Sequence, residues 1–145
     1  MKFPLHIPFV EALGFELHAF ADGHAELRVD LGQAHLNSWD VAHGGVLMTL
    51  LDVAMAHAAR SPGADGVAET SGVVTIEMKT SFMRPGLGRL RAIGRRLHRT
   101  TSFAFCEASL LDAEGQLLAH ATGTFKFLKG LPAGGKRIQR IEASD

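Results

Sequence analysis

The residues best suited to chemistry lie between Asn37 and Ala59, in the stretch NSWDVAHGGVLMTLLDVAMAHAA. The stretch is polar at first, turns at His43-Gly44-Gly45, and then continues as about four turns of apolar residues, interrupted by Asp52. A carboxylate that is buried without a partner is costly, so its pKa must rise or donors must be supplied. Asp52 is therefore the first candidate catalytic residue.

The spacing around Asp52 offers one donor within the same helix. Thr49 lies three residues earlier, on the same helical side, and its hydroxyl is within reach of the carboxylate. The structural alternative is that Asp52 caps a loop or pairs with an arginine. The neighbouring glycine pair favours the catalytic interpretation.

Gly44 and Gly45 fall at the expected start of the helix. A helix N-terminus has unpaired N–H groups and a partial positive charge, and glycine lets a substrate atom approach the backbone closely. These properties suit a developing oxyanion, although two glycines also simply permit a tight turn. Asn37 and His43 either add hydrogen bonds to a substrate or hold the shape of the loop.

The separation of Gly44 and Asp52 restricts how both act on one substrate. They are eight residues apart, which is roughly 12 Å along a helix. A single thioester or ester carbonyl cannot contact both. We therefore expect two antiparallel copies of the helix in a two-fold dimer, with the site at the interface.

Other chemistries lack their motifs. The chain has no G-x-S-x-G elbow, C-x-x-C or H-E-x-x-H pattern, P-loop or G-x-G-x-x-G fingerprint. The spacing of His35, Asp40 and His43 is not distinctive for metal binding. We expect no metal and no cofactor, and we interpret His57 and His120 as packed or solvated rather than catalytic.

The elements that must position these residues follow from hydrophobic patterning. We expect a short helical turn over 8–13, one long helix over 44–60, and strands over 15–20, 25–31, 72–83, 90–99, 102–111 and 116–128. The order β-β-α-β-β-β-β with short turns predicts an α+β protein with a large antiparallel sheet. Because the long helix is apolar on nearly every face, the sheet, a partner subunit or both must cover it.

Composition and charge narrow the class of protein. The 145 residues fit one domain, which we place at 1–128, followed by a flexible Gly-rich tail at 129–145. Lys and Arg number 15, as do Asp and Glu, so a nucleic-acid partner is not expected. The single cysteine, Cys106, suits the cytoplasm and is expected to be a buried strand residue. No signal peptide or membrane span is evident, so no membrane association is expected.

A basic run is the second feature that carries information. Seven basic residues and no acid lie between Lys79 and Arg99. The run is either a phosphate-binding rim or a solvated sheet edge balanced by acids elsewhere. A small phosphorylated ligand is more plausible here than a nucleic acid.

The chain resembles the hotdog-fold acyl-CoA thioesterases of the phenylacetic-acid-degradation (PaaI-like) type. Asn37, the triplet His43-Gly44-Gly45 and Asp52 match the family's helix signature, although Leu51 abuts the aspartate while Leu50 fills the expected leucine position. VVTIEMKTSFMRPG and AEGQLLAHATGTFKFL resemble two of its strands. The likeness covers about residues 10–128.

The resemblance implies a helix wrapped by a curved sheet, in a homodimer that is often a homotetramer. Asp52 acts as nucleophile or general base, Thr75 assists it, and the Gly44 N–H polarises the carbonyl. Asn37 and His43 position water or the carbonyl. The implied division places Asn37 and Gly44 on one subunit and Asp52 and Thr75 on the other.

The resemblance also places substrate contacts outside this catalytic set. Gly45 lies beside the substrate, and Arg84 and Arg99 fall near the CoA nucleotide. The expected function is hydrolysis of an aryl or a short- or medium-chain acyl-CoA. The alternatives are a hotdog enoyl-CoA hydratase or dehydratase, and a non-catalytic acyl-CoA-binding protein.

Overall fold

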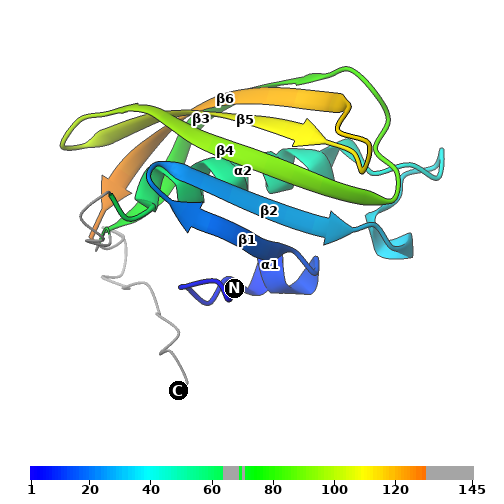
Figure 1. Cartoon of the computed structure of the whole chain (residues 1–145), viewed down its shortest axis with the longest axis horizontal. Coiled ribbons are helices and arrows are strands. Elements are labelled where there is room, and N and C mark those ends of the chain that lie inside the picture. Colours follow the sequence, from blue (N-terminus) through cyan, green and yellow to red (C-terminus); the bar gives the residue numbers. More distant parts are fainter. Residues whose placement is uncertain (64–68, 70, 130–145) are drawn as a thin grey trace.

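One long helix lies against a curved, six-stranded antiparallel sheet in a computed structural model of the chain, which describes residues 1–63, 69 and 71–129 (Figure 1). The elements are α1 (Pro8–Ala12), β1 (Glu16–Ala21), β2 (His24–Asp30), the short 3₁₀ helix η1 (Gln33–His35), α2 (Gly44–Arg60), β3 (Gly72–Phe82), β4 (Arg89–Arg99), β5 (Phe103–Leu111) and β6 (Leu117–Leu128). The predicted α+β order is confirmed, and every predicted helix and strand ends within one residue of its observed bounds. Among the helices and strands of the described residues, the prediction missed only η1.

The sheet has the strand order β1-β2-β4-β5-β6-β3. The strand that follows α2, β3, therefore does not pair with β2 but lies at the far edge beside β6, and the helix crosses the inner face between them (Figure 1). β1 forms the other edge. The long helix thus has the interior of the sheet on one side and the edge strand β3 along its flank.

Alternation along the strands builds the core. In β2, Ala25, Leu27 and Val29 are buried and the charged residues between them face outward. The buried residues of the other strands meet the apolar residues of α2 in a single cluster. Cys106 belongs to this cluster, as expected for a buried strand residue, and burial raises the pKa of its thiol to about 12.

The helix is not covered on every side within one chain. Ten of its seventeen residues are buried, but Gly45, Thr49, Asp52 and Ala56 remain partly or fully exposed. These positions are four, three and four residues apart, so they lie along one side of the helix. We call them the open stripe. The sheet therefore supplies most of the expected cover and leaves a strip that contains Asp52.

Two segments lie outside the described residues. They are 64–68 with 70, between α2 and β3, and 130–145 of the expected tail, so the division into a domain at 1–128 and a flexible tail stays a prediction. No helix in the described ranges combines the length and the hydrophobicity needed to span a bilayer.

Candidate active site

Asp52 and Thr75 meet where α2 passes the edge strand β3. The Thr75 hydroxyl donates a hydrogen bond to Asp52 Oδ1 at 2.7 Å. Partial burial raises the pKa of Asp52 above its usual value, and the Thr75 hydrogen bond opposes this rise by favouring the carboxylate. No arginine or lysine in the described residues pairs with Asp52. The carboxylate therefore keeps an oxygen that no cation neutralises, as a base or nucleophile requires.

The expectation that Thr49 donates to Asp52 is wrong. The Thr49 hydroxyl donates to the Gly45 carbonyl one turn back, at 2.7 Å. A threonine inside a helix often satisfies its hydroxyl in this way. The donor to Asp52 therefore comes from a neighbouring strand and not from the same helix.

His43 caps the start of α2. Its Nδ1 accepts the Gly45 N–H at 2.9 Å, and its carbonyl accepts the N–H groups of Val46 and Leu47. A Cβ at position 45 would lie 3.0 Å from that Nδ1, so glycine leaves room for the cap. Of the two roles left open for His43, the structure supports holding the loop, and the Gly45 N–H is already used.

The Gly44 N–H, in contrast, has no hydrogen-bond acceptor among the described residues. The ring of Phe82, the last residue of β3, lies 3.7 Å from where a Gly44 Cβ would be. The donor at the first position of the helix is therefore open beside an aromatic ring. Phe82 was not singled out from the sequence, because an apolar residue in a strand is usually part of a core.

Asn37 holds the loop that leads into α2. Its side-chain Oδ1 accepts the N–H of Trp39 at 2.8 Å and that of Val41 at 3.4 Å. Its carbonyl accepts the N–H of Asp40, which has a positive φ of 58°. The amide nitrogen of Asn37 donates to no described residue and remains available to a ligand.

The predicted site residues thus form two groups in one chain. Asn37, His43, Gly44 and Gly45 gather at the start of α2, whereas Asp52 and Thr75 lie in its middle. The eight residues between Gly44 and Asp52 correspond to roughly 12 Å of helix. One chain alone does not bring the two groups onto a single carbonyl.

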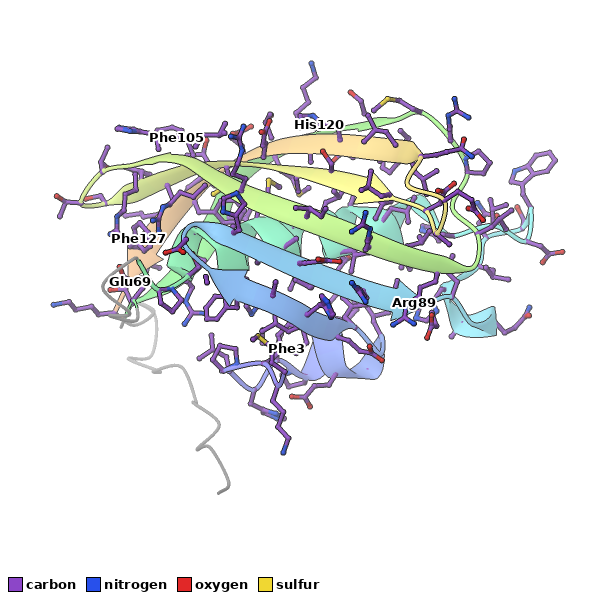
Figure 2. The ribbon with its side chains drawn as sticks, in the orientation of Figure 1. Phe3, Glu69, Arg89, Phe105, His120 and Phe127 are labelled. Atoms are coloured by element: carbon purple, nitrogen blue, oxygen red, sulfur yellow. The ribbon has the colours of Figure 1, made fainter. Side chains whose placement is uncertain are left out.

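The two arginines predicted to contact the CoA nucleotide lie at opposite ends of β6. Arg84 follows β3, bonds through its N–H to Leu118 at the start of β6, and donates to Gln116 at 2.7 Å. Arg99 donates to Glu69 at 2.9 Å and stacks 4.2 Å from the ring centroid of Phe127, at the end of β6 (Figure 2). The structure does not bring these two residues together in one chain.

Most of the remaining basic run is paired on the outer face of the sheet. Arg89 lies 3.6 Å from Asp30, Arg91 lies 3.6 Å from Glu26, and Arg95 lies 2.6 Å from Glu107. Arg96 donates to the Ala59 carbonyl at the end of α2. For Arg89, Arg91 and Arg95, the interpretation as a solvated surface balanced by acids is correct, but β4 is an inner strand and not the expected sheet edge.

No group of three or more His, Cys, Asp or Glu side chains in the described part of the chain is arranged to hold a metal ion. His57 is buried against the rings of Phe3 and Phe20, as a packed histidine should be. His120 lies on the outer face of the sheet, 3.3 Å from Glu107 (Figure 2). Neither histidine contributes to the two groups above.

Comparison with known proteins agrees with this geometry. The sequence profile of the Thioesterase superfamily matches residues 40–119, which include Gly44, Asp52 and Thr75. The medium/long-chain acyl-CoA thioesterase YigI of Escherichia coli K12 is 28% identical over 135 residues, covering 85% of this chain and 87% of YigI.

Two solved structures extend the similarity to the fold. The conserved protein PA5202 from Pseudomonas aeruginosa superposes with a TM-score of 0.77 at 31% identity, covering 86% of this chain and 97% of PA5202. A mutant of the phenylacetic acid degradation protein PaaI from Thermus thermophilus gives a TM-score of 0.73 at 31% identity, covering 84% of this chain and all of that one. The chain therefore belongs to the thioesterase superfamily, as a thioester hydrolase of the PaaI type with the hotdog fold.

Proposed function

We propose that the protein is an acyl-CoA thioesterase, which converts an acyl-CoA and water into a carboxylic acid and free CoA. The observation that carries the proposal is the Asp52 carboxylate on the open stripe, with the Thr75 hydroxyl as its donor and no cationic partner among the described residues. The open Gly44 N–H supports the same chemistry. The acyl-CoA substrate of the relative YigI adds support for CoA as the thiol.

In the proposed reaction the Gly44 N–H donates to the thioester carbonyl and stabilises the negative charge that develops on its oxygen. Asp52 either removes a proton from the attacking water or attacks the carbonyl carbon itself. The new C–O bond forms, the C–S bond breaks, and the CoA thiolate takes up a proton. In the second case water then hydrolyses the anhydride with Asp52.

The site requires two subunits in this proposal. Asn37, His43, Gly44 and Gly45 of one chain face Asp52 and Thr75 of its partner, because roughly 12 Å separates the groups within one helix. The open stripe and the edge strand β3 are the surfaces for the two-fold contact. Arg84 is exposed near this edge and suits a CoA phosphate. Arg99 as a CoA contact, a tetramer and a cytoplasmic location also remain predictions from the sequence.

The test is a thiol-release assay of Asp52→Asn over aryl, short, medium and long acyl-CoAs. We expect kcat to fall by about two orders of magnitude or more, because the amide cannot act as base or nucleophile. Asp30→Asn, which changes an exposed aspartate elsewhere, is the matched control. Turnover near the wild-type rate in folded Asp52→Asn would exclude the mechanism.

The same substrates separate the two alternatives. Addition of water to crotonyl-CoA without thiol release would indicate a hydratase. His43 is a poor candidate for that acid or base, because its Nδ1 accepts the Gly45 N–H. Tight binding of acyl-CoA with no product of either kind would indicate a binding protein.

A further inference from the structure

An extra residue interrupts β3 directly after Thr75. The pairing with β6 runs Thr75 with Phe125 and then Glu77 with Thr124, so Ile76 has no partner and forms a β-bulge. Ile76 is 52% exposed on the edge strand and is not part of the hydrophobic cluster. The bulge therefore exposes an apolar side chain without improving the packing of the core.

The pattern on either side of the bulge shows that Ile76 is an insertion into a regular strand. Before it, Val73 and Thr75 face the helix; after it, Met78 and Phe82 face the helix. Glu77 faces outward, where it accepts from Thr124. If Ile76 were removed, inward and outward residues would still alternate without a break, so the direction of each side chain does not require the bulge.

A bulge bends its strand and increases the local twist, which re-aims the neighbouring side chain. Here the affected neighbour is Thr75, whose hydroxyl is the donor to Asp52. The other inward contact of β3 with the site, between Phe82 and Gly44, lies at the far end of the strand. The bend therefore acts at the one point of β3 that contacts the carboxylate.

We propose that the bulge at Ile76 holds the Thr75 hydroxyl on the Asp52 carboxylate, which makes Ile76 a positioning residue of the site. Its effect on turnover rests on the proposed function, in which Asp52 does the chemistry. Its effect on the Thr75–Asp52 contact does not, so the two are tested separately.

The experiment deletes Ile76 in the full-length protein and measures kcat, KM and the crystal structure. We expect kcat to fall about tenfold or more with KM nearly unchanged, as in Thr75→Val, because both lose a hydrogen bond to a charged group. In the double variant, which combines Thr75→Val with the deletion of Ile76, kcat should fall no further than in Thr75→Val alone, because the deletion acts through Thr75. A wild-type kcat in the deletion variant would overturn the proposal, and so would a double variant in which the losses of the two single variants add.

Two control variants separate the bulge from other effects. Ile76→Ala keeps the extra residue and should lose much less of kcat than the deletion does; an equal loss would assign the role to the side chain and overturn the proposal. Deletion of Leu97 removes the similar bulge in β4, at an equally exposed aliphatic residue. It lies three strands from Thr75, about 14 Å away, and should leave kcat unchanged.

A second variant guards against a deletion that does not fold. Deleting Ile76 and inserting alanine between Met78 and Lys79 moves the bulge along β3 and keeps every other pairing with β6. It should lose activity like Thr75→Val, and full activity would overturn the proposal. If Asp52→Asn retains turnover, kcat no longer reports on the Thr75–Asp52 contact, and the crystal structure of the deletion variant is the test. An intact Thr75–Asp52 hydrogen bond in that structure, without the bulge, would overturn the positioning role.

Discussion

The Asp52 carboxylate must be ionised to act as base or nucleophile, so activity should fall as the pH drops through its pKa. Burial raises that pKa, and the hydrogen bond from Thr75 lowers it. Thr75→Val removes the donor with little change in shape. We expect the acid limb of the kcat/KM profile to move to higher pH in this variant.

Thr75→Ser is the control for this shift, because it keeps a hydroxyl at the same position. Its acid limb should stay with that of the wild type. A Thr75→Val profile that superposes on the wild type would show that the hydrogen bond does not set the ionisation of Asp52.

His57 makes a separate prediction, about stability. Burial lowers its pKa to about 4, and its Nε2 has no partner among the described residues, so the folded protein keeps the ring neutral. The unfolded chain takes up the proton near pH 6.5. The folded state is therefore fully favoured above pH 6.5 and loses stability as the pH falls from there to about 4, by about 3 kcal/mol in all.

His57→Leu should remove this part of the pH dependence, because leucine cannot take up a proton in either state. The measurement is the free energy of unfolding by urea at several pH values between 7 and 4. His24→Gln, at an exposed histidine, should keep the wild-type slope. Equal slopes for His57→Leu and the wild type would contradict the assignment.

At the scale of elements, the close approach of β4 to α2 depends on Gly94. A Cβ at this position would overlap the backbone carbonyl of Ala54, two residues after Asp52. Gly94→Ala should push the strand from the helix and cost about 1–3 kcal/mol of stability. Gly32→Ala, where a Cβ would make only ordinary contacts, should be nearly neutral in the same urea titration.

The elements themselves were predictable because their patterns are local. The long helix and six strands follow from apolar spacing and turn residues, and Gly44–Arg60 was placed without error. The donor to Asp52 was not predictable in this way. Thr49 is near in sequence, but Thr75 reaches Asp52 only because β3 crosses to the far edge of the sheet.

Contacts in space also explain the other differences. From the sequence, His43 is equally suited to bind substrate or to cap the helix. The hydrogen bond from the Gly45 N–H to its Nδ1 supports the cap. The bulge at Ile76 could not be predicted from the sequence. Two apolar residues and a threonine precede it, so the alternation of inward and outward residues in β3 has no clear start. Arg99 resembles a free cation until Glu69 and Phe127 are placed beside it.

At the scale of the whole molecule, two uncovered features lie side by side. The open stripe of α2 leaves Asp52 accessible, and β3 presents an unpaired edge with Ile76 and Phe82 half exposed. An unpaired edge is a ready site for pairing with another strand. A two-fold contact through this region would cover both features and supply Asp52 with the Gly44 of a second chain.

Subunit mixing tests this arrangement directly. In the proposed dimer, Asn37→Ala damages the half-site of one chain and Asp52→Asn damages the other half-site. A mixed dimer of the two variants has one site with both defects and one intact site. If the subunits exchange at random from equal amounts, half of the dimers are mixed, and activity should recover to about a quarter of the wild-type value.

The control is a mixture of Asp52→Asn with Thr75→Val, whose defects fall in the same half-site. Every site of their mixed dimer carries one of the two defects, so the activity should not exceed the residual activity of Thr75→Val. Each variant alone sets the baseline. Recovery that appears only after exchange, and only for the Asn37→Ala pair, requires that residues from two chains act on one thioester. If each mixture shows only the summed activity of its two variants measured alone, the whole site lies within a single chain. A change in the helix itself would then have to close the roughly 12 Å between Gly44 and Asp52.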